Sequence, residues 1–395
     1  MENVSSSNGL EKRPRLRFPG FEGAWTKTEF HNFAEVNPKC PSIPDQFYYI
    51  DLGSVEDGEL CNIRVENAHS APSRAHRLLS KDDILFQTVR PYQQNNFLFC
   101  DENELPTVAS TGYAVFRTRY DVQYLFALIH TKHFLSSVLS RCTGTSFPAV
   151  SASDIEDIIV WTTAIKEQRK IGELFRLLNV KIAKQKALVD GLKKYKRGVN
   201  NQLLSQIDNS CNCRLGSICK IVGGGTPDTL HAEYWGSTVE WFTPSEIGKT
   251  KYVSNSVRKL SDIGLNNSSA KLLPIGTVLL TTRATLGEMS IAKRECCTNQ
   301  GFQSLVPHQD RVSSEYLYYM QIIIKPWCEK YASGNTFREI SKSALSNCII
   351  PLPDRTRQEE IVKLLSSIDI LISAEESIAM SLSKMRHGLM QQLFI

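Results

Sequence analysis

Two polar clusters in the sequence carry the side-chain types with which proteins read DNA. One cluster occupies residues 87–95 and the other residues 281–285, and each directly follows a β-like apolar run. Arg can pair bidentately with guanine, Gln and Asn can pair with adenine, and Thr and Lys suit phosphates. We therefore expect these clusters, with two nearby lysines, to contact DNA. The candidates are Gln87, Thr88, Arg90, Gln93, Gln94, Asn95, Lys249, Lys251, Thr281, Thr282, Arg283 and Thr285.

A second interpretation of the clusters stays open, because a segment rich in Gln, Asn and Thr can simply be a polar loop. An arginine recurs at the equivalent place in both, as Arg90 and Arg283, after the equivalent predicted strand. This recurrence strengthens the case for a binding role, and both interpretations stay open.

Motifs for catalysis are absent from the sequence. Residues 223–227 (Gly-Gly-Gly-Thr-Pro) are not followed by the lysine of a phosphate-binding loop, so they predict a tight turn. No segment resembles the Asn-Pro-Pro-Tyr motif with which amino-methyltransferases hold a flipped base. His130 and His133 have metal-like spacing but no third ligand, so we interpret them as a solvated pair. We expect no catalytic residue, no cofactor and no metal.

The composition is that of a globular protein with two or three domains. The chain has 395 residues, of which 42% are hydrophobic and 22% charged, and its net charge is only +5. No apolar stretch is long enough to span a membrane. Eleven scattered cysteines without a Cys-x-x-Cys motif indicate reduced thiols, so we expect a cytoplasmic protein.

The sequence repeats itself at a fixed separation of 190 residues. The helical run that begins at Gln168 recurs at Gln358, and its apolar positions superimpose, for example Ile171 on Ile361. The register also holds upstream, where Ser151 and Ser153 correspond to Ser341 and Ser343. A repeat of this length is a whole domain with its following helix, used twice, which predicts pseudo-two-fold character.

These patterns predict an α+β fold with five parts. Residues 1–14 are expected to form a flexible tail, 15–162 a first mixed α/β domain and 163–206 a long helix. Residues 207–353 are expected to form a second mixed domain and 354–395 a second long helix. Within the domains we predict strands at 47–50, 84–89, 239–242, 277–281 and 303–306, and helices over 122–139 and 316–331.

Both long helices carry a narrow apolar seam and are polar elsewhere, so each needs a partner to bury its seam. The predicted seam positions include Leu178 and Tyr195 in the first helix and Leu364 in the second. The first helix is strongly basic and the second slightly acidic. Two-fold symmetry of the repeat then predicts that the two helices form an antiparallel coiled coil.

At this point the chain resembles a specificity subunit of a type I restriction–modification system. The resemblance covers nearly the whole chain. It rests on residues 14–21 with Trp25, on Gly-Gly-Thr-Pro at 224–227, on Trp-Phe-Thr-Pro-Ser-Glu-Ile at 241–247, and on Ile-Ile-Pro-Leu-Pro at 349–353 before Gln358. The first half departs from this pattern because it lacks the Gly-Gly-Thr-Pro segment. A Glu-Gln pair, Glu167 and Gln168, is replaced in the second half by Arg357 and Gln358.

The resemblance implies a function and a set of partners. Residues 15–162 and 207–353 would be target-recognition domains that each read one half of a bipartite double-stranded DNA sequence. The helices would set the spacing and dock two methyltransferase subunits, and nuclease and translocase activity would belong to a restriction subunit. The alternatives are a non-catalytic coiled-coil scaffold for other proteins and a solitary methyltransferase, which the missing motifs disfavour.

Overall fold

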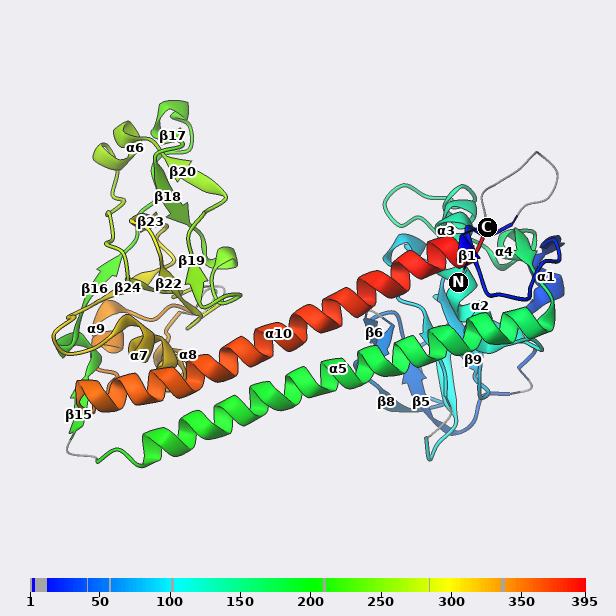
Figure 1. The fold of residues 1–395 in the computed structure, drawn as a ribbon, viewed down its shortest axis with the longest axis horizontal. Coiled ribbons are helices and arrows are strands. Elements are labelled where there is room, and N and C mark those ends of the chain that lie inside the picture. The colour runs from blue at the N-terminus through cyan, green and yellow to red at the C-terminus, as the bar shows by residue number, and fades with distance from the viewer. Residues whose placement is uncertain are drawn as a thin grey trace. The chain divides into compact units, whose positions relative to one another are not determined.

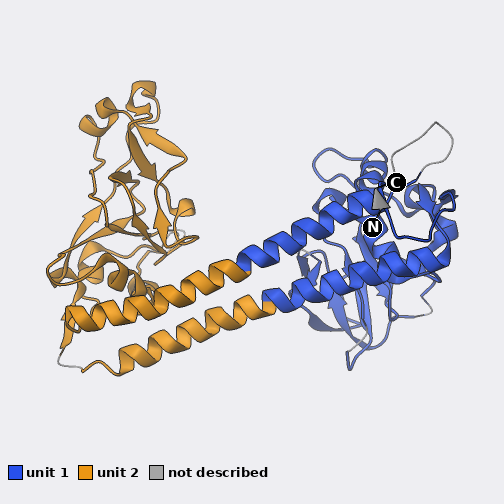
Figure 2. Cartoon of the chain, in the orientation of Figure 1, with its two compact units in different colours: residues 1–186, 376–395 blue, residues 187–375 orange. Residues whose placement is uncertain are grey.

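The computed structural model describes residues 2–3, 13–40, 42–56, 58–100, 103–208, 211–283, 285–334 and 338–395. The chain forms two compact units (Figure 2). Unit 1 consists of residues 1–186 and 376–395, and unit 2 of residues 187–375. Most of the predicted flexible tail lies outside the described residues. Of that tail, Glu2–Asn3 form strand β1, which pairs with β2 (Leu16–Arg17).

Unit 1 contains two four-stranded sheets (Figure 1). The first is antiparallel, in the order β11-β10-β13-β4, and the second has the order β8-β5-β12-β9 with β5 and β12 parallel. The predicted strands at 47–50 and 84–89 are confirmed as β5 and β10. The strands of the two sheets are β4 (Ala34–Val36), β5 (Gln46–Ile50), β8 (Arg64–Asn67), β9 (Ala75–Leu78), β10 (Ile84–Gln87), β11 (Phe97–Leu98), β12 (Thr107–Ser110) and β13 (Tyr113–Thr118).

Short helices and two further strand pairs complete the first mixed domain. One strand pair closes the domain just before the long helix, because β14 (Ile159–Thr162) lies antiparallel to β3 (Thr26–Glu29). The other elements are β6 (Val55–Glu56), β7 (Glu59–Leu60), α1 (Phe30–Phe33), η1 (Pro91–Gln93), α2 (Val122–Ile129), α3 (Lys132–Leu139) and α4 (Ala152–Glu156).

The predicted single helix over 122–139 is wrong, because the chain forms α2 and α3 with a break between them. Thr131 is extended, and its side chain caps α3 by accepting a hydrogen bond from the amide of Phe134. A threonine that satisfies a free amide in this way ends one helix and starts the next. The helix predicted over 316–331 is likewise two helices in the structure, which meet at Met320.

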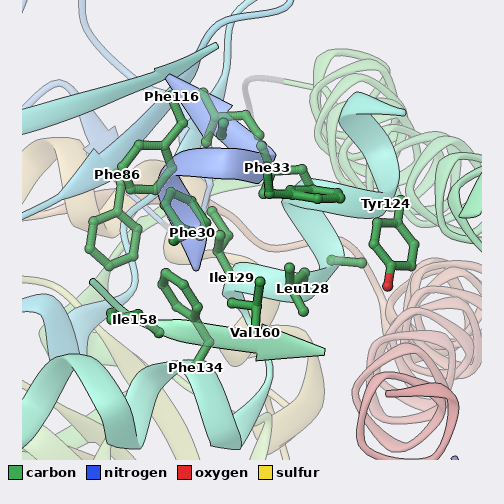
Figure 3. Close-up of a cluster of buried hydrophobic side chains, with 14 of the residues drawn as sticks. Phe30, Phe33, Phe86, Phe116, Tyr124, Leu128, Ile129, Phe134, Ile158 and Val160 are labelled. Atoms are coloured by element: carbon green, nitrogen blue, oxygen red, sulfur yellow. The ribbon is translucent and has the colours of Figure 1, made fainter. Parts of the chain in front are cut away.

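An aromatic cluster forms the core of the first domain (Figure 3). Phe116 packs edge-on against Phe30, with ring centroids 4.8 Å apart, and stacks with Phe86 at 5.1 Å. Near the end of the chain, Phe394 packs 5.1 Å from Tyr124. The last turn of the second long helix is therefore anchored in the hydrophobic core that the first domain builds.

Unit 2 repeats this plan with two sheets in the orders β16-β24-β21-β22-β19 and β17-β20-β18-β23 (Figure 1). In the second of these sheets β18 and β23 are parallel, as β5 and β12 are in unit 1. The predicted strands at 239–242, 277–281 and 303–306 are confirmed as β18, β21 and β24. The strands are β15 (Asn212–Arg214), β16 (Cys219–Gly223), β17 (Trp235–Gly236), β18 (Val239–Phe242), β19 (Tyr252–Val253), β20 (Arg258–Leu260), β21 (Val278–Leu280), β22 (Met289–Ala292), β23 (Cys296–Thr298), β24 (Gln303–Pro307) and β25 (Ile349–Pro351).

Three helices of unit 2, α7, α8 and α9, lie about 190 residues after α2, α3 and α4 of unit 1. Their N-caps repeat as well, since Ser341 caps α9 by accepting from an amide as Ser151 caps α4. The helices are η3 (Leu215–Ser217), η4 (Ala232–Tyr234), η5 (Pro244–Glu246), α6 (Asp262–Asn266), α7 (Ser314–Tyr319), α8 (Gln321–Tyr331) and α9 (Lys342–Ser346).

The two long helices are α5 (Ile165–Ser205) and α10 (Arg355–Leu393), close to the predicted bounds. They run antiparallel within each unit. In unit 1, Phe175 contacts Phe394, and Asn179 accepts a hydrogen bond from Arg386. In unit 2, Lys196 bonds to Asp369 and Arg357 to Gln206. Partner numbers rise along α5 as they fall along α10, which confirms the predicted antiparallel coiled coil.

The seam of this coiled coil differs from the prediction at particular positions. Tyr195 is 62% exposed and Leu364 is 46% exposed, whereas the neighbouring Leu365 is fully buried. Phe175, which the heptad pattern did not include, is 2% exposed and packs against the aromatic core. Each helix also packs against its own domain, so its buried stripe is wider than a seam between two helices alone.

Candidate nucleic-acid interface

In unit 1, the polar segment after β10 folds back on itself. The side-chain nitrogen of Gln87 donates to the carbonyl of Val89 and to the side-chain oxygen of Gln93, both at 2.8 Å. Its side-chain oxygen accepts from the backbone amide of Asn95. Gln87 is 2% exposed. Its side chain therefore shapes the loop from within, and Gln93 and Gln94 lie at the loop surface.

Thr88 and Arg90 leave the strand toward the segment that precedes α4. The Thr88 hydroxyl donates to the carbonyl of Gly112 at 2.8 Å. Arg90 has a left-handed backbone, with φ of 56°, and its guanidinium lies 4.3 Å from the ring centroid of Phe147. Phe147 is 63% exposed, so this stacked pair is a surface feature. Stacking against a ring fixes the plane of the guanidinium and leaves donors at its edge.

The corresponding segment in unit 2 is also internally bonded. Thr281 and Thr282 are fully buried, and the backbone amide of Thr282 donates to the carbonyl of Gly301 at 2.7 Å. Arg283 forms an ion pair with Glu339, with Nε 2.8 Å from Oε2. The hydroxyl of Thr285 makes only a long contact of 3.4 Å to the carbonyl of Pro244. Arg283 is therefore neutralised by a carboxylate in this state.

The two candidate lysines occupy different environments. Lys249 is exposed, and its ammonium has no hydrogen-bond or ion-pair partner among the residues that the structure describes. Lys251 is half-buried, and its ammonium donates to the hydroxyls of Tyr319 and Ser366, both at 3.0 Å. Burial lowers the pKa of Lys251, and the nearby carboxylate of Asp369 acts in the opposite direction. Lys251 thus ties its loop to α10, and Lys249 is the one of the two that is available to a ligand.

A cleft of about 640 Å³ in unit 1 lies beside the loop after β10 and is also lined by α5 and α10. Gln93, Gln94 and Arg386 face it, together with Arg176 and Lys186. Arg176 pairs with Glu173, and Lys186 pairs with Glu59. Two of the three basic side chains in this cleft are therefore already neutralised.

His130 lies at the edge of the same cleft and is not the solvated residue that its spacing suggested. Its Nδ1 lies 2.7 Å from the carbonyl of Phe126, and its Nε2 lies 3.3 Å from the side-chain nitrogen of Asn96. Since that nitrogen only donates, Nε2 accepts and Nδ1 carries the proton. Burial lowers the pKa of His130 to about 4, so the imidazole is neutral at physiological pH.

Two arginines that the motif search missed lie on the second sheet of each unit. Arg64 of β8 lies over the ring of Tyr49, and Arg258 of β20 lies over the ring of Trp235. In the sequence, each of these arginines is marked only by its place at the start of a short polar strand that is near an aromatic strand. The strand pairing needed to connect them is not readable from local sequence.

Among the described residues, no group of three or more His, Cys, Asp or Glu side chains is placed to hold a metal ion. All eleven cysteines lie in the described part of the chain and are free thiols. Within those same residues, no helix is both long and apolar enough to cross a membrane.

Comparison with known proteins finds a family model that matches part of the chain. The family model described as the type I restriction modification DNA specificity domain matches residues 207–382. The type I restriction enzyme MjaIX specificity subunit of Methanocaldococcus jannaschii is 34% identical over 186 residues, which are 46% of this chain and 43% of that protein. The EcoR124I/EcoR124II specificity subunit of Escherichia coli is 26% identical over 51% of this chain and 52% of its own length. The chain thus spans about half the length of these relatives.

Longer but weaker matches extend over most of the chain. The HindI specificity subunit of Haemophilus influenzae is 22% identical over 372 residues, covering 73% of this chain and 80% of that protein. A chain from a structure of a type I R-M system superimposes with a TM-score of 0.60 over 96% of this chain and 99% of its own, at 22% identity. The S subunit from M. genitalium gives a TM-score of 0.54 over 97% and 99%, at 14% identity. These structures confirm the fold, and the named relatives are all specificity subunits, as the sequence motifs indicated.

Proposed function

We propose that this chain, whose residues 207–382 match the model of the type I restriction modification DNA specificity domain, is the DNA-recognition subunit of a type I restriction–modification system. It reads a bipartite double-stranded target, with residues 15–162 recognising one half-site and residues 207–353 the other. It performs no catalysis itself, and it acts in the cytoplasm on the DNA of the cell. Methyltransferase and restriction subunits that bind it carry out the chemistry.

One observation carries this proposal: the two units share a frame but differ in their surface loops. Gln168 donates to the carbonyl of Thr163 at 2.7 Å, and Gln358 donates to the carbonyl of Pro353 at 3.0 Å. Each glutamine and its acceptor recur at the separation of the repeat. The loop after the central strand is rich in Gln and Asn in unit 1 and in Thr in unit 2. Helices and strands that recur in both units suit two identical partner subunits. Surface loops that differ between the units suit two different half-sites.

We further propose that the helix pair docks two methyltransferase subunits. Both helices keep polar and apolar side chains exposed outside their buried stripe, among them Leu177 and Leu188 on α5 and Ile370 and Met380 on α10. These exposed apolar side chains offer contact surface along both helices that a partner subunit would cover.

The test is to map methylated adenines in the host genome with and without the gene for this chain. We expect a bipartite methylation motif that disappears on deletion and returns when the gene is restored. Replacement of residues 213–350 by another domain of the family should change only one half of the motif. A change in both halves would refute the modular assignment, and an unchanged methylome after deletion would refute the function.

A binding assay separates DNA recognition from a protein scaffold. The affinity of the full chain for duplex DNA should fall linearly with salt on a double logarithmic scale, because each neutralised phosphate releases counterions. Absence of specific binding at any salt concentration, together with capture of a protein partner only, would favour the scaffold. Adenine methylation by the purified chain alone would show that it is an enzyme.

A further inference from the structure

The second sheets of the two units present an arginine at the same structural position. In unit 1, Arg64 of β8 is directly opposite Tyr49 of β5. In unit 2, Arg258 of β20 is directly opposite Trp241 of β18. In both cases the arginine is the first residue of its strand, and the aromatic strand also pairs in parallel with a third strand. The two arginines are therefore structural equivalents.

Both guanidinium groups lie on aromatic rings. Cζ of Arg64 is 5.1 Å from the ring centroid of Tyr49. Cζ of Arg258 is 3.4 Å from the ring centroid of Trp235 and 5.8 Å from that of Trp241. The shorter distance corresponds to direct stacking on an indole, the ring that attracts cations most strongly. Stacking holds the plane of the fork while its edge donors stay free to bind.

The carboxylates near the two arginines are arranged differently. Arg64 is bound to Glu66 at 2.8 Å and to Asp51 at 3.2 Å, so two carboxylates neutralise its charge. Arg258 is exposed and has no carboxylate partner among the residues that the structure describes.

The nearest acidic residue along the partner strand is Glu240, and other groups engage it. Its carboxylate lies 2.7 Å from the ammonium of Lys259 and accepts from Ser256. Because successive residues of a strand point to opposite faces, the pair of Glu240 and Lys259 lies on the face opposite Arg258 and Trp241. Arg258 is thus an exposed guanidinium at the border of the hydrophobic cluster around Trp241, and no carboxylate of the described residues neutralises it.

The surroundings of Arg258 fit a base edge better than a phosphate alone. Arg258 is exposed, and its guanidinium is held against the ring of Trp235. An arginine fork matches O6 and N7 of guanine in the major groove. A phosphate contact would not require a fixed plane.

We propose that Arg258 is a specificity-determining residue that reads a guanine in the half-site recognised by unit 2. The equivalent Arg64 does not read a base, because Glu66 and Asp51 neutralise its charge. This inference rests on the proposed DNA-recognition function and adds to it one contact and one base.

The test selects binding sites from a pool of random-sequence duplexes with the purified full chain and its Arg258→Ala, Arg258→Lys and Arg64→Ala variants. The wild type should enrich a bipartite motif that contains a guanine in the unit 2 half-site. Arg258→Ala should lose discrimination at that one position by about tenfold to a hundredfold and keep the rest of the motif. Arg258→Lys should lose it as well, because lysine keeps the charge but not the fork. Arg64→Ala should leave the motif unchanged.

The outcomes separate this inference from the function on which it rests. If the wild type enriches a motif and Arg258→Ala retains every position, Arg258 does not read a base. If Arg258→Ala weakens all sequences equally and Arg258→Lys restores binding, the residue contacts a phosphate and the inference is overturned. If the wild type enriches no motif, the proposed function itself fails. Thermal unfolding of each variant identifies any loss that comes from misfolding, and for a misfolded variant Arg258→Gln provides the replacement.

Discussion

Arg17 and Glu167 form a buried, bidentate ion pair between the start of the first domain and the first turn of α5. Nε of Arg17 lies 2.8 Å from one carboxylate oxygen of Glu167, and a second guanidinium nitrogen lies 2.8 Å from the other. The side chains are 5% and 1% exposed. At the position of the repeat that matches Glu167, the second half has Arg357, which pairs with Glu360 on the helix surface.

Removal of the Glu167 carboxylate should strongly destabilise unit 1. In Glu167→Ala the guanidinium of Arg17 stays buried without a counter-charge, which costs about 3–5 kcal/mol. Urea denaturation followed by tryptophan fluorescence measures this loss. Glu173→Ala, in an exposed pair on the same helix, is the matched control and should change stability little. Equal effects of the two substitutions would show that burial of the pair does not matter.

Gln358 should be needed for the start of α10. Its amide donates to the carbonyls of Arg311 and Pro353, and its oxygen accepts from the amide of Ser313. Gln358→Ala leaves these part-buried groups without their partner and should lower the free energy of unfolding by about 1–3 kcal/mol. The control is the exposed neighbour Glu359, whose substitution by Ala should have little effect. A Gln358→Ala protein as stable as the wild type in chemical denaturation would contradict this role.

His130 should make unit 1 sensitive to acid. Its folded pKa of about 4 lies below the ordinary value of 6.5, because it is buried, with a smaller contribution from nearby Arg386. Below pH 6.5 the unfolded chain binds a proton that the folded chain does not, so stability falls as the pH drops from about 6.5 to about 4. His130→Gln should flatten this part of the stability profile, whereas the exposed His133→Gln should leave it unchanged. Denaturation midpoints across this pH range provide the measurement.

The repeat in the sequence predicted the frame of the fold well, and the reason is local. The N-caps Ser151 and Ser341 and the glutamines Gln168 and Gln358 satisfy backbone groups within a few residues, so their spacing is visible in the chain itself. The prediction that Tyr195 and Leu364 are buried in the seam was wrong because each helix also packs against a domain. That packing widens the buried stripe in a direction that heptad spacing does not encode.

The candidate site was harder to predict, because the polarity of a residue does not show whether its side chain points into the domain or toward the solvent. Gln87 ends strand β10 and Thr282 follows strand β21, and both carry polar groups, yet the fold turns both side chains inward. Arg64 and Arg258 became visible only once pairing with Tyr49 and Trp241 was known. Those pairs depend on short strands far apart in sequence, and a shift of one residue would reverse every face.

Lys249 and Lys251 offer a matched test of the DNA surface, since they lie two residues apart on one loop. Lys249 is exposed and unpaired among the described residues, whereas Lys251 is bound to Tyr319 and Ser366. Lys249→Ala should weaken DNA binding about equally for all sequences and reduce the salt slope by about 1, as expected for one lost phosphate contact.

Lys251→Ala should instead lower the unfolding midpoint of unit 2 and keep the salt slope of the wild type. Its ammonium bonds to hydroxyls within the unit, and its removal leaves Tyr319 and Ser366 without that donor. Titration of fluorescent duplex DNA at several salt concentrations, with thermal unfolding in parallel, measures both quantities. If Lys251→Ala reduced the salt slope and Lys249→Ala did not, the side of this loop that carries Lys251 and contacts α10 would be the side that faces DNA. The assignment of Lys249 to the DNA surface would then be wrong.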